Sequence, residues 1–315
     1  MKYSNGKLLA VGTVCLAWLW MGCQGATLNI PDVGTSENPL EKSGQLSKSE
    51  VWAGKILITG DVVVPEGTTL TIQPNSIIGF DPANGAHQLI VYGTLFAEGE
   101  PERFITFGSL GTAENPPTAG DWIGIFLGET SVNSRLVYCR IRHADTGVAC
   151  RSDSSQVENC LMTDNEVAIL CDDATPLISH NEINKNGTAV KCVNDAAPEI
   201  NRNTIQANEY GIVCDDDSRA TINNNELSSN YQHAIVCFAL SSPEIVSNNI
   251  FLNGGWAVYD GGRLRDNFIR GNNERGSDVI EHGTGRDGGQ FYGVDEVLDP
   301  RVSPVVDAGA QRERF

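Results

Sequence analysis

Apolar and polar positions repeat along the middle of the chain with a period of 21 to 23 residues. Five cysteines mark the repeat: Cys150, Cys171, Cys192, Cys214 and Cys237. An aliphatic residue stands two positions before each of them: Val148, Ile169, Val190, Ile212 and Ile235. Because side chains of a β-strand alternate between its two faces, residues two apart share a face. We expect both columns to point into the interior.

A second pattern, Asn-x-(Ile or Leu)-x-x-Asn, precedes the cysteine in later repeats. Its first asparagine is Asn181, Asn203, Asn225, Asn248 or Asn267, and its last is Asn186, Asn208, Asn230, Asn253 or Asn272. Two earlier repeats have Cys139 and Cys160 in the first position. A further aliphatic column precedes the pattern: Val157, Ile178, Ile200, Ile222 and Ile245.

The apolar stretches of each repeat, separated by Asn, Gly, Asp or Pro, are too short for helices. They predict an all-β solenoid with about three short strands per coil, stacked because one coil cannot bury an apolar face alone. Equivalent side chains of stacked coils then lie about 4.8 Å apart. The asparagine columns are expected to be structural ladders, because Asn tolerates left-handed backbone at bends and its amide can donate to the adjacent copy.

The rest of the chain divides around these repeats. Residues 1–22 predict an export signal that is removed, with Lys2 and Lys7 before an apolar stretch. Residues 23–50, rich in Ser, Gly, Glu and Lys, predict a flexible tether. Residues 51–132 are assigned to N-terminal coils, 133–275 to regular coils, and 276–315 to a C-terminal cap and tail. One elongated domain is expected.

The end of the signal, Met21-Gly22-Cys23, is similar to a bacterial lipobox. The similarity implies a lipid on Cys23 and a protein attached to the cell envelope. Gln24 differs from the aspartate that implies inner-membrane retention, which favours the outer membrane or cell surface. The alternative is a secreted or periplasmic protein that is cleaved near Ala26.

The net charge of the chain restricts the classes of partner that it can bind. Forty acidic residues against 22 basic ones give a formal net charge of −18, which argues against binding nucleic acid or an anionic membrane surface. We expect a monomer that contacts the membrane only through its lipid. Neutral or basic ligands and divalent cations suit this charge, although surface carboxylates also serve solubility alone.

The columns resemble those of right-handed parallel β-helix proteins, the broad group that includes pectate lyases, polygalacturonases and NosD-like periplasmic proteins. Residues 62–72, 89–95 and 120–125 are similar to the opening coils of exported bacterial members, and residues 299–309 are similar to their closing tail. The resemblance covers roughly residues 51–310. It implies a single-stranded right-handed parallel β-helix and specifies no activity.

Seven cysteines lie in the inward columns, an odd number that cannot all pair within one chain. Disulfides between adjacent coils are conceivable in an oxidising compartment. Side chains in register point the same way, however, which suits buried thiols that pack as small hydrophobic groups. A line of thiols also lacks the tetrahedral convergence of a metal site.

Acidic residues just after the cysteines form the outward column with candidate chemistry. The residues of a possible catalytic site are Asp172, Asp173, Lys191, Asp215, Asp216 and Asp217. A possible calcium site comprises Asp173, Asn194, Asp195 and Asp216, because Ca²⁺ takes six to eight oxygen ligands. Two simpler explanations stay open: Arg151, Lys191 and Arg219 neutralise the column, or it consists of solvated polar turns.

Polygalacturonase motifs match only in part. Asp172-Asp173 matches one of them, Glu281-His282-Gly283 half-resembles another, and Arg140-Ile141-Arg142 lies upstream of its expected place. His180 and His233 are expected to be surface residues. The sequence therefore favours a non-catalytic, envelope-anchored protein that binds a glycan or another surface partner and requires no cofactor. A polysaccharide lyase or glycoside hydrolase working on the outer face is the alternative.

Overall fold

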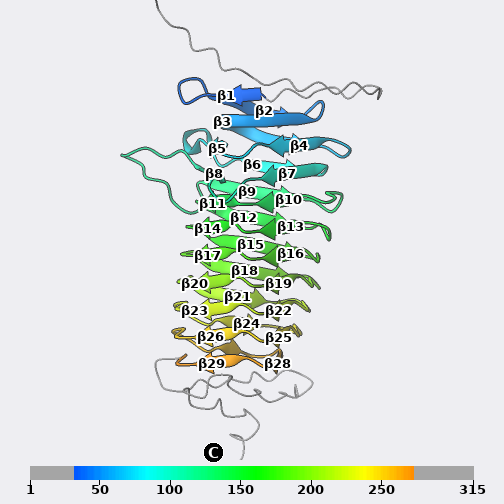
Figure 1. The fold of residues 1–315 in the computed structure, drawn as a ribbon, viewed down its shortest axis with the longest axis vertical. Helices are drawn as coiled ribbons and strands as arrows, with labels where there is room; N and C mark the ends of the chain where they lie inside the picture. The colour runs from blue at the N-terminus through cyan, green and yellow to red at the C-terminus, as the bar shows by residue number, and fades with distance from the viewer. Residues whose placement is uncertain (1–31, 273–315) are drawn as a thin grey trace, which may run out of the picture. The chain divides into compact units, whose positions relative to one another are not determined.

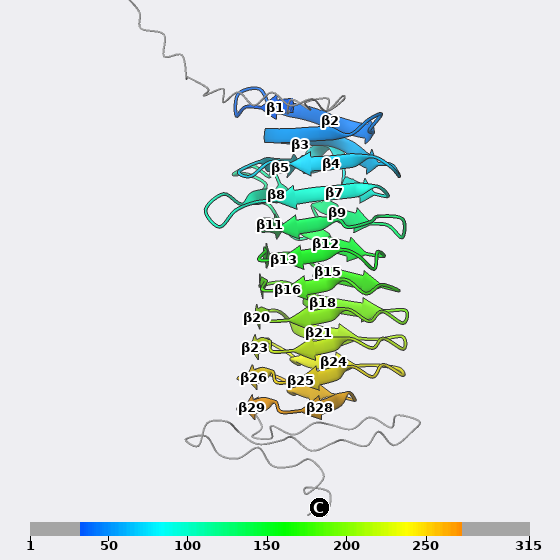
Figure 2. The ribbon, with the colours of Figure 1, turned by 45° about the vertical axis from the view of Figure 1, so that its right-hand side comes forward.

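The computed structural model describes residues 32–272, which form a parallel β-solenoid of about 11 coils (Figure 1). Each regular coil contributes one short strand to each of three parallel stacks, and the same strands recur coil above coil in a second view (Figure 2). The only helical turn in this range is Pro82–Asn84. Within residues 32–272, no helix is long and apolar enough to cross a membrane. The predicted all-β fold with three strands per coil is confirmed.

We name the three parallel stacks by their order within a coil. Stack 1 comprises β4 (Thr69–Ile72), β7 (Thr94–Glu98), β10 (Arg135–Val137), β13 (Gln156–Glu158), β16 (Leu177–Ser179), β19 (Glu199–Asn201), β22 (Thr221–Asn223), β25 (Glu244–Val246) and β28 (Arg263–Arg265). Stack 2 comprises β5 (Ile77–Phe80), β8 (Ile105–Ser109), β11 (Cys139–Arg142), β14 (Leu161–Thr163), β17 (Glu182–Asn184), β20 (Thr204–Gln206), β23 (Glu226–Ser228), β26 (Asn249–Phe251) and β29 (Phe268–Arg270). Stack 3 comprises β6 (Gln88–Val91), β9 (Trp122–Leu127), β12 (Ala144–Cys150), β15 (Val167–Asp172), β18 (Thr188–Val193), β21 (Tyr210–Cys214), β24 (Ile235–Cys237) and β27 (Val258–Tyr259).

The N-terminal coils differ from the predicted boundaries. Strand β3 (Glu50–Val64) runs through all three stacks as one continuous coil and pairs with β4, β5 and β6. On its other side it pairs with β1 (Asp32–Gly34) and β2 (Leu40–Gln45). Residues 32–50 therefore open the solenoid and are not a tether. Composition misled here, because most side chains of β2 are exposed and polar while its backbone completes the ladder beside β3.

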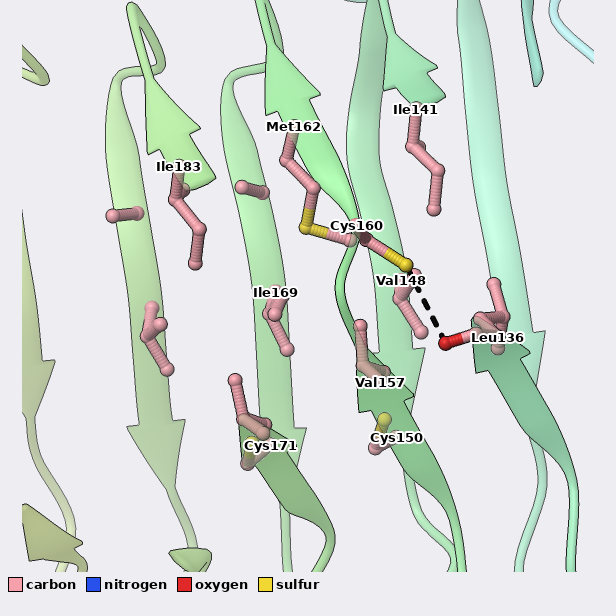
Figure 3. Packing of buried hydrophobic residues seen from close by; sticks show 14 of the residues in the cluster. Leu136, Ile141, Val148, Cys150, Val157, Cys160, Met162, Ile169, Cys171 and Ile183 are labelled. Carbon is pink, nitrogen blue, oxygen red and sulfur yellow. Dashed lines mark hydrogen bonds between the residues drawn. The ribbon is translucent and has the colours of Figure 1, made fainter. Parts of the chain in front are cut away.

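The interior consists of the predicted inward columns. All seven cysteines from Cys139 to Cys237 are buried free thiols, as predicted. In stack 3, cysteines of adjacent coils are paired in register, for example Cys171 with Cys192. Figure 3 shows the aliphatic side chains packed between them, with the thiol of Cys160 donating to the carbonyl of Leu136 at 3.4 Å. The cysteines thus fill the core as small apolar groups.

The asparagine ladders are also confirmed, and Asn203 shows their geometry. Its Oδ1 accepts from the backbone N–H and the Nδ2 of Asn181 at 2.9 and 3.0 Å. Its Nδ2 donates to the carbonyl of Ile178 at 2.9 Å and to Oδ1 of Asn225 at 3.0 Å. A second ladder runs through Asn165, Asn186, Asn208, Asn230, Asn253 and Asn272. Buried polar atoms at both bends are therefore satisfied from coil to coil.

One predicted reason for asparagine is wrong. The left-handed residue at each bend stands one position before the ladder asparagine and is often another residue type. Before the first ladder these residues are His180, Arg202, Asn224, Ser247 and Asp266, with φ between 53 and 56°. Asparagine is required for its paired donor and acceptor, and the backbone strain is carried by its neighbour.

Candidate functional site

The coil leaves stack 3 through a sharp turn, and the residues of these turns that follow the cysteines of stack 3 form the corner strip. Positive φ angles recur there, at 49° for Asp173, 54° for Asn194 and 48° for Asp216. Asp and Asn adopt this left-handed conformation more readily than most residues. Turn geometry alone thus accounts for much of the acidic column. This supports the simpler explanation by polar turns.

A shallow hollow of about 200 Å³ opens at this strip, lined by Glu129, Arg151, Asp172, Asp173 and Asn194. Arg151 follows β12 and reaches across to Asp172 at the end of β15, with its Nε 2.7 Å from Oδ2. Asn194 in the next coil donates from Nδ2 to the other oxygen of Asp172 at 2.7 Å. The Nη1 of Arg151 lies 3.6 Å from the carboxylate of Glu129. The hollow is therefore a connected charged network.

This network determines what its groups can do. The hydrogen bond that Arg151 donates to Asp172, and then the charge of Asp172, raise the pKa of Arg151 above its ordinary value. Both oxygens of Asp172 are engaged, one by a cation and one by an amide. A proton-transfer role for Asp172 would require this ion pair to break. Asp173 and Glu129 line the same hollow. Within residues 32–272 the carboxylate of Asp173 has no hydrogen bond or ion pair, and that of Glu129 has only its 3.6 Å contact with Arg151, so these are the available carboxylates.

The other predicted site residues are dispersed. Asp195 pairs with Arg219, whose Nη2 lies 2.9 Å away, and Asp215 accepts from the backbone N–H of Asp216 at 2.9 Å. Lys191 stands on the outer face of β18, in register with Leu170 and Val213 and outside the corner strip. It forms no ion pair within residues 32–272. The predicted neutralisation by Arg151 and Arg219 is confirmed, whereas Lys191 takes no part in it.

The predicted calcium ligands do not form a cluster. In the part of the chain that the structure describes, no three acidic, histidine or cysteine side chains gather closely enough to hold a metal ion. The predicted convergence of Asp173, Asp195 and Asp216 is therefore absent from the described residues. One physical reason is that Asp195 is paired with Arg219.

The polygalacturonase-like motifs are also separated. Arg140 belongs to β11 in stack 2, where its guanidinium lies over the ring of Phe104 at 4.7 Å. Asp172 ends β15 in stack 3. His180 is exposed at a bend of the backbone. Residues 281–283, like Cys23 and the predicted closing tail, lie outside the described residues.

Sequence reasoning missed an aromatic group on the outer face of stack 3, which we call the aromatic patch: Tyr210, His233, Trp256 and Tyr259. All four side chains are partly exposed. The rings of His233 and Tyr259 are stacked with centroids 4.9 Å apart, and those of Tyr210 and His233 are 6.3 Å apart. A signal was present in part, because Tyr210 and His233 stand four residues before Cys214 and Cys237 and therefore in one column. Strict alternation would have turned this column inward, whereas the structure leaves it partly exposed. Glu129 was likewise missed.

Comparison with known proteins concerns the fold. A structure of the periplasmic alginate epimerase AlgG is similar, with a TM-score of 0.48 and 12% identity, over 68% of this chain and 58% of that chain. A point mutant of the same enzyme gives a TM-score of 0.43 and 13% identity, over 76% and 61%. The chain thus spans about three fifths of the length of these proteins. No curated protein matches the sequence.

The family is established by a direct match. The family model of the right handed beta helix region matches residues 123–284, which is about half of the chain. The matched segment contains the regular coils with their cysteine and asparagine ladders. Together with the three parallel stacks, this match shows that the chain belongs to the right-handed β-helix family.

Proposed function

We propose that the protein is a non-catalytic, cell-envelope-associated β-helix that binds a glycan or another surface partner along its outer side. The supporting observation is the state of the charged groups at the corner strip. Arg151 and Asn194 both donate hydrogen bonds to Asp172, and Arg219 donates to Asp195. Groups locked in this way suit a rigid surface, because a rigid binding surface pays little ordering entropy when it captures a ligand.

The alternative is a polysaccharide lyase or glycoside hydrolase, and the hollow is the observation that favours it. Asp173 and Glu129 bring carboxylates to one recess from the two coils that flank the coil of Arg151. A glycosidase needs two carboxyl groups roughly 5 to 9.5 Å apart. Stacked coils supply such spacings anywhere along their surface, so the recess alone does not favour catalysis over binding.

The two functions separate in one assay. The mature protein is incubated with acidic and neutral polysaccharides, with Ca²⁺ or with a chelator, and both retention and new chain ends are measured. Retention without reducing ends or unsaturated uronates supports the proposal. Cleavage that disappears in Asp173→Ala or Glu129→Gln, and persists in the turn variant Asp216→Ala, would establish the enzyme instead.

Export and anchoring are part of the same proposal. We assign residues 1–22 to the signal and the lipid to Cys23, which would place the solenoid at the outer membrane or cell surface. Intact mass of the protein recovered from membranes tests this assignment. A diacylglyceryl mass that is lost in Cys23→Ser is expected, and a soluble product beginning near Ala26 would overturn it.

A further inference from the structure

We propose that the aromatic patch is the binding site for a neutral glycan, with sugar rings packed against Tyr210, Trp256 and Tyr259 and with His233 as the spacer between the two tyrosines. This inference rests on the proposed function and names the site and the ligand class that the proposed function leaves open. The patch lies on β21, β27 and the segments that lead into β24 and β27. It is distinct from the hollow at Arg151, whose lining residues lie at or just after the C-terminal ends of β9, β12, β15 and β18, whereas the patch begins at the start of β21.

The register of stack 3 builds the patch. Ile212 pairs with Ile235, and Ile235 with Val258, so the positions two residues earlier, Tyr210, His233 and Trp256, lie one above another. This column is partly exposed, because the alternation of inward and outward side chains is interrupted by the consecutive buried pairs Ala234–Ile235 and Ala257–Val258. Tyr259 belongs to the neighbouring outward column, in register with Val236. Successive coils lie about 4.8 Å apart, so the patch extends along the solenoid axis for several strand spacings.

The rings are held in place before any ligand arrives. The Nδ1 of His233 accepts from the backbone N–H of Trp256 at 2.8 Å, which fixes the imidazole between its neighbours. Tyr259 stacks on it with an interplanar angle of 16°. Aromatic side chains lose few rotamers on binding, and a prearranged group lowers that cost further.

The fold itself does not require aromatic residues here. In the preceding coils the same outward position is occupied by Thr146, Val167 and Thr188, which pair in register with one another and then with Tyr210. These coils keep the same strands and buried columns. The change to three successive aromatic side chains is therefore not accompanied by a change in the core. A partly exposed group of aromatic side chains indicates a binding site.

The chemistry of the patch selects a neutral sugar. One face of a pyranose ring is made of C–H groups that pack on an aromatic face, and its hydroxyl groups need polar partners at the edge. Glu209 and Asp260 directly adjoin Tyr210 and Tyr259 in sequence and can accept such hydroxyl groups. The same carboxylates, and a net charge of −18, repel a polyuronate.

The test is binding of soluble neutral polysaccharides, namely β-glucan, xylan and galactomannan, with polygalacturonate as the acidic comparison. Affinity is measured for the unaltered protein, for Tyr210→Ala and for Tyr259→Ala. The matched control is Tyr92→Ala, which removes a 42% exposed tyrosine from a distant coil. Emission of Trp256 gives an independent signal, since Trp52 and Trp122 are fully buried.

We expect at least one neutral polymer to bind and to shift the Trp256 emission, and each patch substitution to weaken that binding about tenfold. Tyr92→Ala should bind as the unaltered protein does. Binding of a neutral polymer that is unchanged in both patch variants but lost in Asp173→Ala would overturn the inference and leave the proposed function standing. Failure to bind any glycan, with normal circular dichroism, would overturn both.

Discussion

At the scale of single residues, the buried asparagines form the most specific interactions between coils. Each one accepts from a backbone N–H of the preceding coil and donates to a backbone carbonyl of that same coil. An apolar replacement cannot be neutral, because it removes one partner and leaves the other buried without a hydrogen bond.

We therefore predict that Asn203→Ala lowers the free energy of unfolding by about 3 kcal/mol. The substitution leaves the backbone N–H of Asn181 and the carbonyl of Ile178 without their partners. Urea denaturation measures the loss. Asn201→Ala, which removes a partly exposed amide from the same coil, should cost less than about 0.5 kcal/mol. Equal losses in the two variants would contradict the ladder.

A cysteine of the core permits a sharper comparison. Cys192→Asp should cost roughly 3–5 kcal/mol, because a buried charge is left without a partner, and is expected to aggregate. Cys192→Val keeps an apolar group of similar size and should cost less than about 1.5 kcal/mol. Yield and thermal midpoint distinguish them. A soluble, stable aspartate variant would show that this column does not face inward.

Buried thiols also make stability depend on alkaline pH. Burial raises the pKa of Cys150 to about 12, while an unfolded cysteine has a pKa of about 8.5. Below about pH 8.5 the thiol is protonated in both the folded and the unfolded chain, so its full contribution to stability is present. Between the two values the unfolded chain releases a proton that the folded chain keeps, so stability falls as pH rises.

Urea midpoints from pH 8 to pH 11 measure this effect. The hydrogen bond with Cys171 raises the pKa of Cys192 most, the one with Cys214 opposes it, and burial adds to the increase. Removing this thiol in Cys192→Val should therefore make the fall of stability with pH less steep. The slope should differ from that of the unaltered protein by about 1.4 kcal/mol per pH unit. Parallel curves would show that the thiols do not titrate on unfolding.

At the scale of strands and coils, periodicity explains why so much of the architecture was predictable. Columns such as Val190 with Cys192 need only a period of two within a strand and of 21 to 23 between coils. The opening strands β1 and β2 have no such copies, so only their pairing with β3 shows what they are. Contacts such as Arg151 with Asp172 depend on rotamers, which no repeat encodes.

Each coil interacts only with its neighbours, which predicts that one complete coil can be removed. Deletion of residues 193–214 joins Cys192 to Asp215 and leaves the columns in phase. The product should fold, unfold cooperatively, and show a urea m-value lower by about a tenth, since m follows the surface exposed. Circular dichroism and urea titration measure this.

Deletion of residues 193–203 is the control, because it removes about half a coil and puts the asparagine and cysteine columns out of phase. We expect it not to fold. If both deletions folded equally well, the stacking register would not be what holds the solenoid together.

At the scale of the described solenoid, the interior and the outer surface have separate roles. The ladders fix a rigid stack, and that stack brings residues far apart in sequence to one surface, such as Tyr210 and Tyr259. The candidate surface could not be predicted in the same way. The corner strip is conspicuous in the sequence through its charge, yet turn geometry explains its Asp and Asn residues. The column of Tyr210 and His233 can be found in the sequence, but its exposure on the outer surface is seen only in the structure.

We propose that the outer surface of the solenoid binds a polymer without altering it. The most direct measurement is the molar mass of a neutral polysaccharide, by size exclusion with light scattering, after it has been bound by the protein and recovered. We expect the retained polymer to have the same molar mass as an untreated sample. A fall in mass that is abolished by Asp173→Ala would contradict it.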